Sequence, residues 1–187
     1  MTAATGRLPK GVVALVVAAA VIMASISTVA IAALSGGLED HNGAFGAVTC
    51  NAPSLPGATI NVTEADMGSS MMGGGLMRPS LYANPTTTPA GKVSFVVRNE
   101  GNLVHEMLVM PLPADGAGTR ATGSDGKINE AASLGEASRS CATGRGDGIA
   151  PGATSWVTLD LAPGRYELVC DQPWHYAAGM FDVLTVQ

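Results

Sequence analysis

Residues 166–181 read YELVCDQPWHYAAGMF and contain a cysteine, a histidine and a methionine in a C-x4-H-x4-M array. The runs on either side of the array, residues 165–170 and 181–187, have the alternating, β-branched and aromatic character of strands. The array begins where one strand is predicted to end and stops where the next begins. A loop must therefore turn Cys170, His175 and Met180 toward one point.

The three side chains of this array are soft or borderline metal donors. A cysteine thiolate, two imidazoles and a long axial thioether form the ligand set of electron-transfer copper. The second imidazole must come from elsewhere, and His105, after a strand pattern and a turn, is the only other histidine inside the domain. A sandwich brings such a position beside the C-terminal strands. The sequence predicts one copper ion, cycling between Cu(I) and Cu(II), at His105, Cys170, His175 and Met180.

At these residues the chain resembles the cupredoxins, and most closely the rusticyanin and sulfocyanin group, whose ligand loop has the same spacing. The likeness spans roughly residues 59–187 and is strongest in two blocks, 93–110 and 166–186. It implies a Greek-key β-sandwich that carries electrons and is not an enzyme. It also implies that His105, Cys170 and His175 are equatorial ligands and that Met180 is axial.

Two residues depart from the pattern of that group. Trp174 stands where similar loops commonly have a glycine directly before the histidine. Glu106 stands where many cupredoxins have an asparagine or serine that helps to tie the two ligand loops together. Both departures affect the surroundings of the copper and therefore its redox potential.

The rest of the chain from residue 59 onward favours an all-β domain. Strand patterns occur at 59–63, 92–98, 106–110, 155–161, 165–170 and 181–187, with Gly- or Pro-containing turns between them. The chain has 24 Gly and 11 Pro but only 4% aromatic residues, as expected for strands and turns. The Gly-rich segment 111–153 is predicted to be an insertion on the sandwich surface, with a short helix possible over 129–138.

The N-terminal region predicts a membrane anchor. Residues 11–34 contain no charge, and as a helix they would extend about 36 Å, enough to cross a hydrocarbon core about 30 Å thick. Arg7 and Lys10 precede the run, while Glu39 and Asp40 follow it. The positive-inside rule then keeps residues 1–10 in the cytoplasm and places the domain in the periplasm or at the cell surface, on a flexible stalk of residues 35–58.

The alternative is a signal peptide that is cleaved near Ala32, in the small-x-small sequence Ala30-Ile31-Ala32, which would release a secreted domain. The apolar run is long for that purpose, since a signal-peptide core has about 7–15 residues. We therefore favour the uncleaved anchor.

The two cysteines outside the copper site are predicted to form a disulfide. The chain has three cysteines, and copper would occupy one of them in an oxidising compartment. The remaining pair is Cys50 and Cys141. Their bond would tie the end of the stalk to the Gly-rich insertion.

A methionine cluster supports a rival function. Clustered thioethers can bind Cu(I), so this cluster is either a secondary Cu(I) site or a loop that packs on the sandwich. Its members are Met67, Met71, Met72 and Met77. A secondary site would suit a copper chaperone or storage protein that hands the metal to a partner.

Other functions fit the sequence less well. A multicopper oxidase needs further His-x-His motifs, and a dinuclear copper domain needs a second cysteine in the loop. A net charge of -5 argues against nucleic acid as a partner. The expected partners are the donor and acceptor proteins of a respiratory chain. They would dock on the apolar surface around His175, which the sequence assigns to Pro173, Trp174, Tyr176, Ala177 and Ala178.

Overall fold

The computed structural model of the chain describes residues 49–66 and 78–187. The predicted membrane span, the cytoplasmic N-terminus and the methionine cluster lie outside these residues. Within them, no helix has the length and apolar character needed to cross a membrane.

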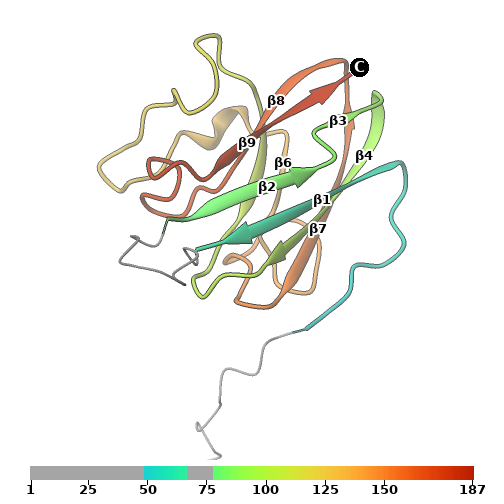
Figure 1. The fold of residues 1–187 in the computed structure, drawn as a ribbon, viewed down its shortest axis with the longest axis horizontal. Coiled ribbons are helices and arrows are strands. Elements are labelled where there is room, and N and C mark those ends of the chain that lie inside the picture. Colours follow the sequence, from blue (N-terminus) through green and yellow to red (C-terminus); the bar gives the residue numbers. More distant parts are fainter. Residues whose placement is uncertain (1–48, 67–77) are drawn as a thin grey trace, which may run out of the picture. The chain divides into compact units, whose positions relative to one another are not determined.

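The described residues form two β-sheets that pack on each other (Figure 1). The first sheet has the order β2-β1-β4-β7, and the second has the order β3-β9-β8-β5-β6. The strands are β1 (Ala58–Ala65), β2 (Ser80–Asn84), β3 (Thr87–Thr88), β4 (Gly91–Asn99), β5 (Met107–Pro111), β6 (Gly135–Ala137), β7 (Thr154–Leu161), β8 (Gly164–Val169) and β9 (Phe181–Val186). The predicted all-β class is confirmed, and all six predicted strands are present.

Alternation along the strands builds the core between the two sheets. In β4, Val93, Phe95 and Val97 are fully buried, as the period of two predicts. They belong to one cluster with Ile60 of β1 and Leu168 of β8, so both sheets contribute their inner faces to it. β8 ends at Val169, directly before Cys170.

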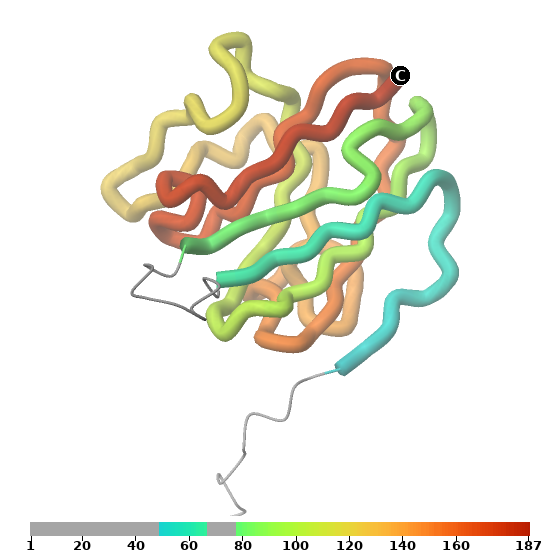
Figure 2. The backbone as a smooth tube through the Cα atoms, in the orientation of Figure 1, coloured from blue at the N-terminus to red at the C-terminus, as the bar shows by residue number. Residues whose placement is uncertain are grey.

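The segment between β5 and β7 is more than a surface insertion, and that part of the prediction is wrong. Figure 2 shows its first half, drawn in yellow, looping beyond the strands. Its second half contributes β6, which pairs with β5 at the edge of the second sheet. Ala137 and Ile149 are fully buried in the main core cluster. The predicted helix over 129–138 shrinks to one 3-10 turn, η1 (Glu130–Ala132), because the following residues pair with β5 instead.

Cys50 and Cys141 are joined by a disulfide, the pair that the sequence predicts. The bond links positions 91 residues apart, the first in the segment before β1 and the second shortly after β6. The backbone N–H of Cys141 also donates to the carbonyl of Thr154, the first residue of β7, at 2.8 Å. The disulfide therefore ties the segment that leads into β1 to the second half of the Gly-rich segment. Cys170 is the remaining cysteine, and it is buried and free.

Candidate metal centre

The predicted ligand loop lies between β8 and β9. Cys170 directly follows β8, and Met180 directly precedes β9. The N–H of Cys170 donates to the carbonyl of Met180 at 3.1 Å, which continues the β8–β9 ladder by one step. The two ends of the loop are thus held together by the sheet.

Tight turns fold the loop back over Cys170. The N–H of His175 donates to the carbonyl of Gln172 at 3.0 Å, and the N–H of Met180 donates to the carbonyl of His175 at 3.1 Å. Gly179 has a φ of +99°, a conformation that side chains other than glycine rarely adopt. Trp174 has a φ of +71°, which explains why a glycine suits this position in similar loops.

His105 reaches the loop from the turn after β4 and is fixed by the Gly-rich segment. It forms an antiparallel bridge with Ile149, with backbone N–H to carbonyl distances of 3.2 and 2.6 Å. Gly148 has a φ of +102°, and a Cβ there would collide with the side chain of Val104. A glycine is therefore required for this close approach. The segment that the sequence assigned to the surface thus positions a ligand.

A buried asparagine, missed by the sequence reasoning, holds the turn that leads to His105. The side-chain amide of Asn99 donates to the carbonyls of Leu103 and Ile149, both at 2.7 Å, and its oxygen accepts from the N–H of Gly101 at 2.8 Å. Asn99 is fully buried. A polar residue with all its hydrogen bonds satisfied in this way makes the turn rigid.

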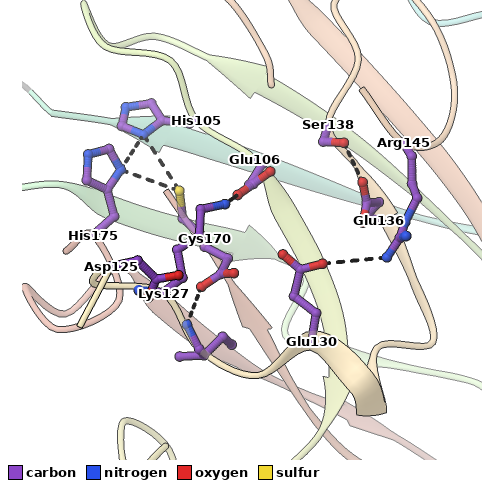
Figure 3. A network of polar contacts seen from close by, with 12 residues as sticks. His105, Glu106, Asp125, Lys127, Glu130, Glu136, Ser138, Arg145, Cys170 and His175 are labelled. Carbon is purple, nitrogen blue, oxygen red and sulfur yellow. Dashed lines mark hydrogen bonds and ion pairs between the residues drawn. The ribbon is translucent and has the colours of Figure 1, made fainter. Parts of the chain in front are cut away.

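The three predicted donors from His105, Cys170 and His175 converge on one point (Figure 3). The two Nδ1 atoms are 3.2 Å apart, and the sulfur of Cys170 is 3.9 Å from Nδ1 of His105 and 3.5 Å from Nδ1 of His175. The centre of a triangle with these sides lies about 2.1 Å from each corner, within the roughly 2.0–2.3 Å of metal bonds to imidazole nitrogen and thiolate sulfur. The donor set fits a trigonal copper centre.

The fourth predicted ligand, Met180, is fully buried and belongs to the same core cluster as Cys170. The structure therefore brings three of the four predicted ligands together, and it holds Met180 against Cys170 through a backbone hydrogen bond at the end of the same loop. Cys170, His105 and Met180 have no exposed surface, whereas His175 is half-buried. Only one ligand of the set approaches solvent.

Burial keeps the free donors in their uncharged forms. It lowers the pKa of His105 to about 4, with a further contribution from His175, so the imidazole is neutral and able to bind a metal near neutral pH. Burial also raises the pKa of the Cys170 thiol well above its usual range, while backbone hydrogen bonds from Gln172 and Glu106 act in the opposite direction. A bound metal ion would favour the thiolate, since a coordinating thiol loses its proton.

Asp66, at the end of β1, is a further residue of the site that sequence reasoning missed. Its Oδ2 lies 3.6 Å from Nε2 of His105, the ring nitrogen that faces away from the donor triangle. The same carboxylate accepts from the backbone N–H groups of Asn102 and Leu103. A Cβ on Gly101 would meet this carboxylate at 2.8 Å, so a glycine is required there. Asp66 thus orients the ring of His105 and fixes the turn before it.

Asp66→Asn should weaken copper binding about tenfold or more, because a carboxylate behind a ligating histidine makes the ring a better donor. The amide oxygen of Asn can still accept from the turn. The reduction potential should become more positive, because the carboxylate charge stabilises Cu(II) and the variant lacks it. Chelator competition and voltammetry measure the two effects, with the exposed Glu100→Gln on the same turn as control. Equal affinity and potential in the two variants would show that Asp66 serves only the turn.

The two departures from the expected loop have structural explanations. The backbone of Glu106 lowers the pKa of the Cys170 thiol, against the effect of burial, so this position acts on the cysteine through its main chain. The Trp174 side chain packs over Gly126 and is 58% exposed. Tyr176, in contrast, is buried, with its hydroxyl 3.0 Å from Oε1 of Glu167, so its predicted place on the docking surface is wrong.

Comparison with known proteins identifies a family and several similar structures. A family model described as copper binding proteins of the plastocyanin/azurin family matches residues 89–187. Similar solved structures include auracyanin from the photosynthetic bacterium Roseiflexus castenholzii, at 20% identity and a TM-score of 0.45 over 70% of this chain and 99% of that one. Rusticyanin from Thiobacillus ferrooxidans has 20% identity and a TM-score of 0.45 over 71% and 79%. Auracyanin B has 21% identity and a TM-score of 0.47 over 73% and 93%. None of the curated proteins matches the chain.

Proposed function

Because the chain belongs to the plastocyanin/azurin family of copper-binding, electron-transferring proteins, we propose that it is a type 1 copper carrier of single electrons at the extracytoplasmic face of a membrane. The observation that carries this proposal is the buried triangle of His105, Cys170 and His175. The copper would supply the redox chemistry by alternating between Cu(I) and Cu(II).

The surroundings of the ligands suit fast electron exchange. Transfer is favoured when the ligands keep one geometry in both oxidation states. His105 is held by its bridge to Ile149 and by Asp66, while Cys170 is held by the β8–β9 ladder. These contacts come from backbone and buried groups, so the site has little freedom to rearrange.

The partly exposed edge of His175 is the proposed route by which electrons enter and leave. It is flanked by the exposed Pro173, Trp174 and Ala177. Leu103 and Val104, just before His105, are 48% and 40% exposed. Exposed apolar residues beside a half-buried ligand suit a small, transient interface with a redox partner.

Trp174→Gly tests this docking surface. A glycine tolerates the φ of +71° better than tryptophan, so the loop should keep its conformation. We expect a several-fold slower electron transfer to a physiological partner with an unchanged visible spectrum. Tyr82→Ser, which alters another exposed ring on β2, is the control. Normal partner rates together with a shifted potential would show that Trp174 shields the copper and does not dock partners.

A copper chaperone or store is the competing function, and the burial of the ligands argues against it. Metal transfer requires an incoming ligand to reach the ion, yet three of the four predicted ligands have no exposed surface. The proposed carrier should lose Cu(I) to an added chelator slowly, over a time far longer than one electron-transfer cycle. Rapid loss would favour the chaperone.

Residues 11–34 are proposed to anchor the domain to the membrane. The support is their length, their lack of charge and the basic residues that precede them. The intact protein should stay in the membrane fraction after carbonate washing, and a chain that begins at residue 35 should not. If the chain that is expressed with residues 1–34 is instead released, with a new N-terminus near residue 33, the segment is a cleaved signal peptide.

A further inference from the structure

Three carboxylates form a second cluster beside the copper ligands. Glu106 directly follows His105, Asp171 directly follows Cys170, and Glu130 begins η1. One oxygen from each of these three carboxylates lies within 4.8 Å of the other two. Figure 3 shows Glu106 and Glu130 on the side of Cys170 opposite His105 and His175.

Two of the three carboxylates are buried and incompletely bonded. Asp171 is 1% exposed, and its Oδ1 accepts from the N–H of Ile128 at 2.6 Å. Its Oδ2 has no hydrogen-bond partner among the described residues, and neither has Oε1 of Glu106, which is 7% exposed. Buried polar atoms normally have a hydrogen-bond partner. Two buried oxygens without one, in a single cluster, therefore indicate a place where a ligand binds.

Nearby basic side chains neutralise the cluster only in part. Nζ of Lys127 is 3.6 Å from Oε1 of Glu106, and the lysine side chain is 36% exposed. Arg145 lies 3.5 Å from Glu130 and is shared with Glu136. Among the described residues Asp171 forms no ion pair.

We propose that Glu106, Glu130 and Asp171 bind a divalent cation of the calcium class next to the copper centre. Carboxylate oxygens are the preferred ligands of such hard ions. Oxygens that bind one Ca²⁺ at about 2.4 Å are at most about 4.8 Å apart, the limit within which these three lie. Mg²⁺ demands a tighter octahedron and should bind more weakly.

The exposed member of the cluster borders a surface pocket. Glu130 is about one-third exposed and lines a surface pocket of about 340 Å³ together with Glu136 and Arg145. The ammonium group of Lys127, close to Oε1 of Glu106, would compete with the ion for this carboxylate. Because Glu106 and Asp171 are each one residue from a copper ligand, a bound cation should disfavour Cu(II) and raise the reduction potential.

Calorimetric titration of the full-length, copper-loaded protein with CaCl₂ at pH 8 tests the proposal. We expect one Ca²⁺ per chain, a higher unfolding temperature with Ca²⁺ than with Mg²⁺, and a more positive potential. Glu130→Gln changes the exposed member and leaves the buried pair intact, and it should weaken binding at least tenfold. Lys127→Gln should tighten binding several-fold by removing the competing ammonium group. The exposed neighbour variant Asp125→Asn is the control and should bind as the wild type does.

The outcomes that would overturn the proposal are distinct. If the wild type shows neither heat of binding nor a shift in unfolding temperature up to several millimolar Ca²⁺, the cluster is balanced by Lys127 and shared protons. If Glu130→Gln binds Ca²⁺ as tightly as Asp125→Asn does, the ion lies elsewhere. Repeating the titration on copper-free protein keeps the result independent of the assigned electron-transfer function.

Discussion

Replacing Cys170 with serine should remove the intense visible absorption of the copper-loaded protein almost completely. The colour of a type 1 centre arises from charge transfer between a thiolate and Cu(II), and a serine hydroxyl is not a soft donor. Cys170 is the only free cysteine, it is fully buried, and its sulfur lies 3.5 and 3.9 Å from the two Nδ1 atoms. Absorption spectroscopy after addition of one equivalent of Cu(II) measures the effect.

His105→Ala is the companion variant, since it removes the only ligand that lies outside the loop. Copper affinity should fall, while thiolate-dependent absorption should persist at saturating copper because Cys170 and His175 remain. An intense visible band retained in Cys170→Ser would mean that another group binds the metal, and the assignment of the site would be wrong.

Among the variants proposed for this protein, removal of the disulfide should lower the free energy of unfolding the most. A bond between residues 91 positions apart restricts the unfolded chain, and the loop-entropy relation gives a contribution of about 4–5 kcal/mol for a loop of this size. The double variant Cys50→Ser, Cys141→Ser should therefore unfold at a much lower denaturant concentration than the wild type. Equilibrium unfolding, with the wild type under reducing conditions as a second comparison, measures the difference.

The copper spectrum separates this effect from damage to the site. Neither cysteine of the disulfide belongs to the donor triangle, so the double variant should keep its visible band when folded. A free energy of unfolding within about 1 kcal/mol of the wild type would contradict the prediction. It would show that the unfolded chain gains little freedom when the bond is absent.

The strands that the sequence predicted are those with strong alternation. β4 and β9 bury apolar residues at a period of two, and the pattern is visible in the sequence alone. The three missed strands are short: β2 has five residues with polar ends, β3 has two threonines, and β6 has three residues in a Gly-rich segment. These strands form because they pair with a longer neighbouring strand, as β6 does with β5. Such pairing depends on residues distant in sequence, so the local sequence does not predict it.

Some residues of the candidate site could likewise be predicted from the sequence, and others could not. The four ligands were predictable because three of them share one loop with a fixed spacing, and the number of histidines restricted the fourth. Three supporting residues could not be predicted, because their roles depend on contacts with residues distant in sequence, such as His105 and Ile149. They are Asp66, Asn99 and Gly148. Asp171 and Glu106 were visible as neighbours of ligands, but only the fold shows that Glu130 lies beside them.

The most direct test of the central claim is a visible absorption spectrum of the copper-loaded, full-length protein, recorded before and after one-electron reduction. The account predicts one copper per chain and an intense thiolate-to-Cu(II) band that disappears on reduction and returns on reoxidation, without loss of metal. A copper-loaded protein with only weak visible bands, or one that releases its copper on reduction, would contradict a type 1 electron-transfer centre at His105, Cys170, His175 and Met180.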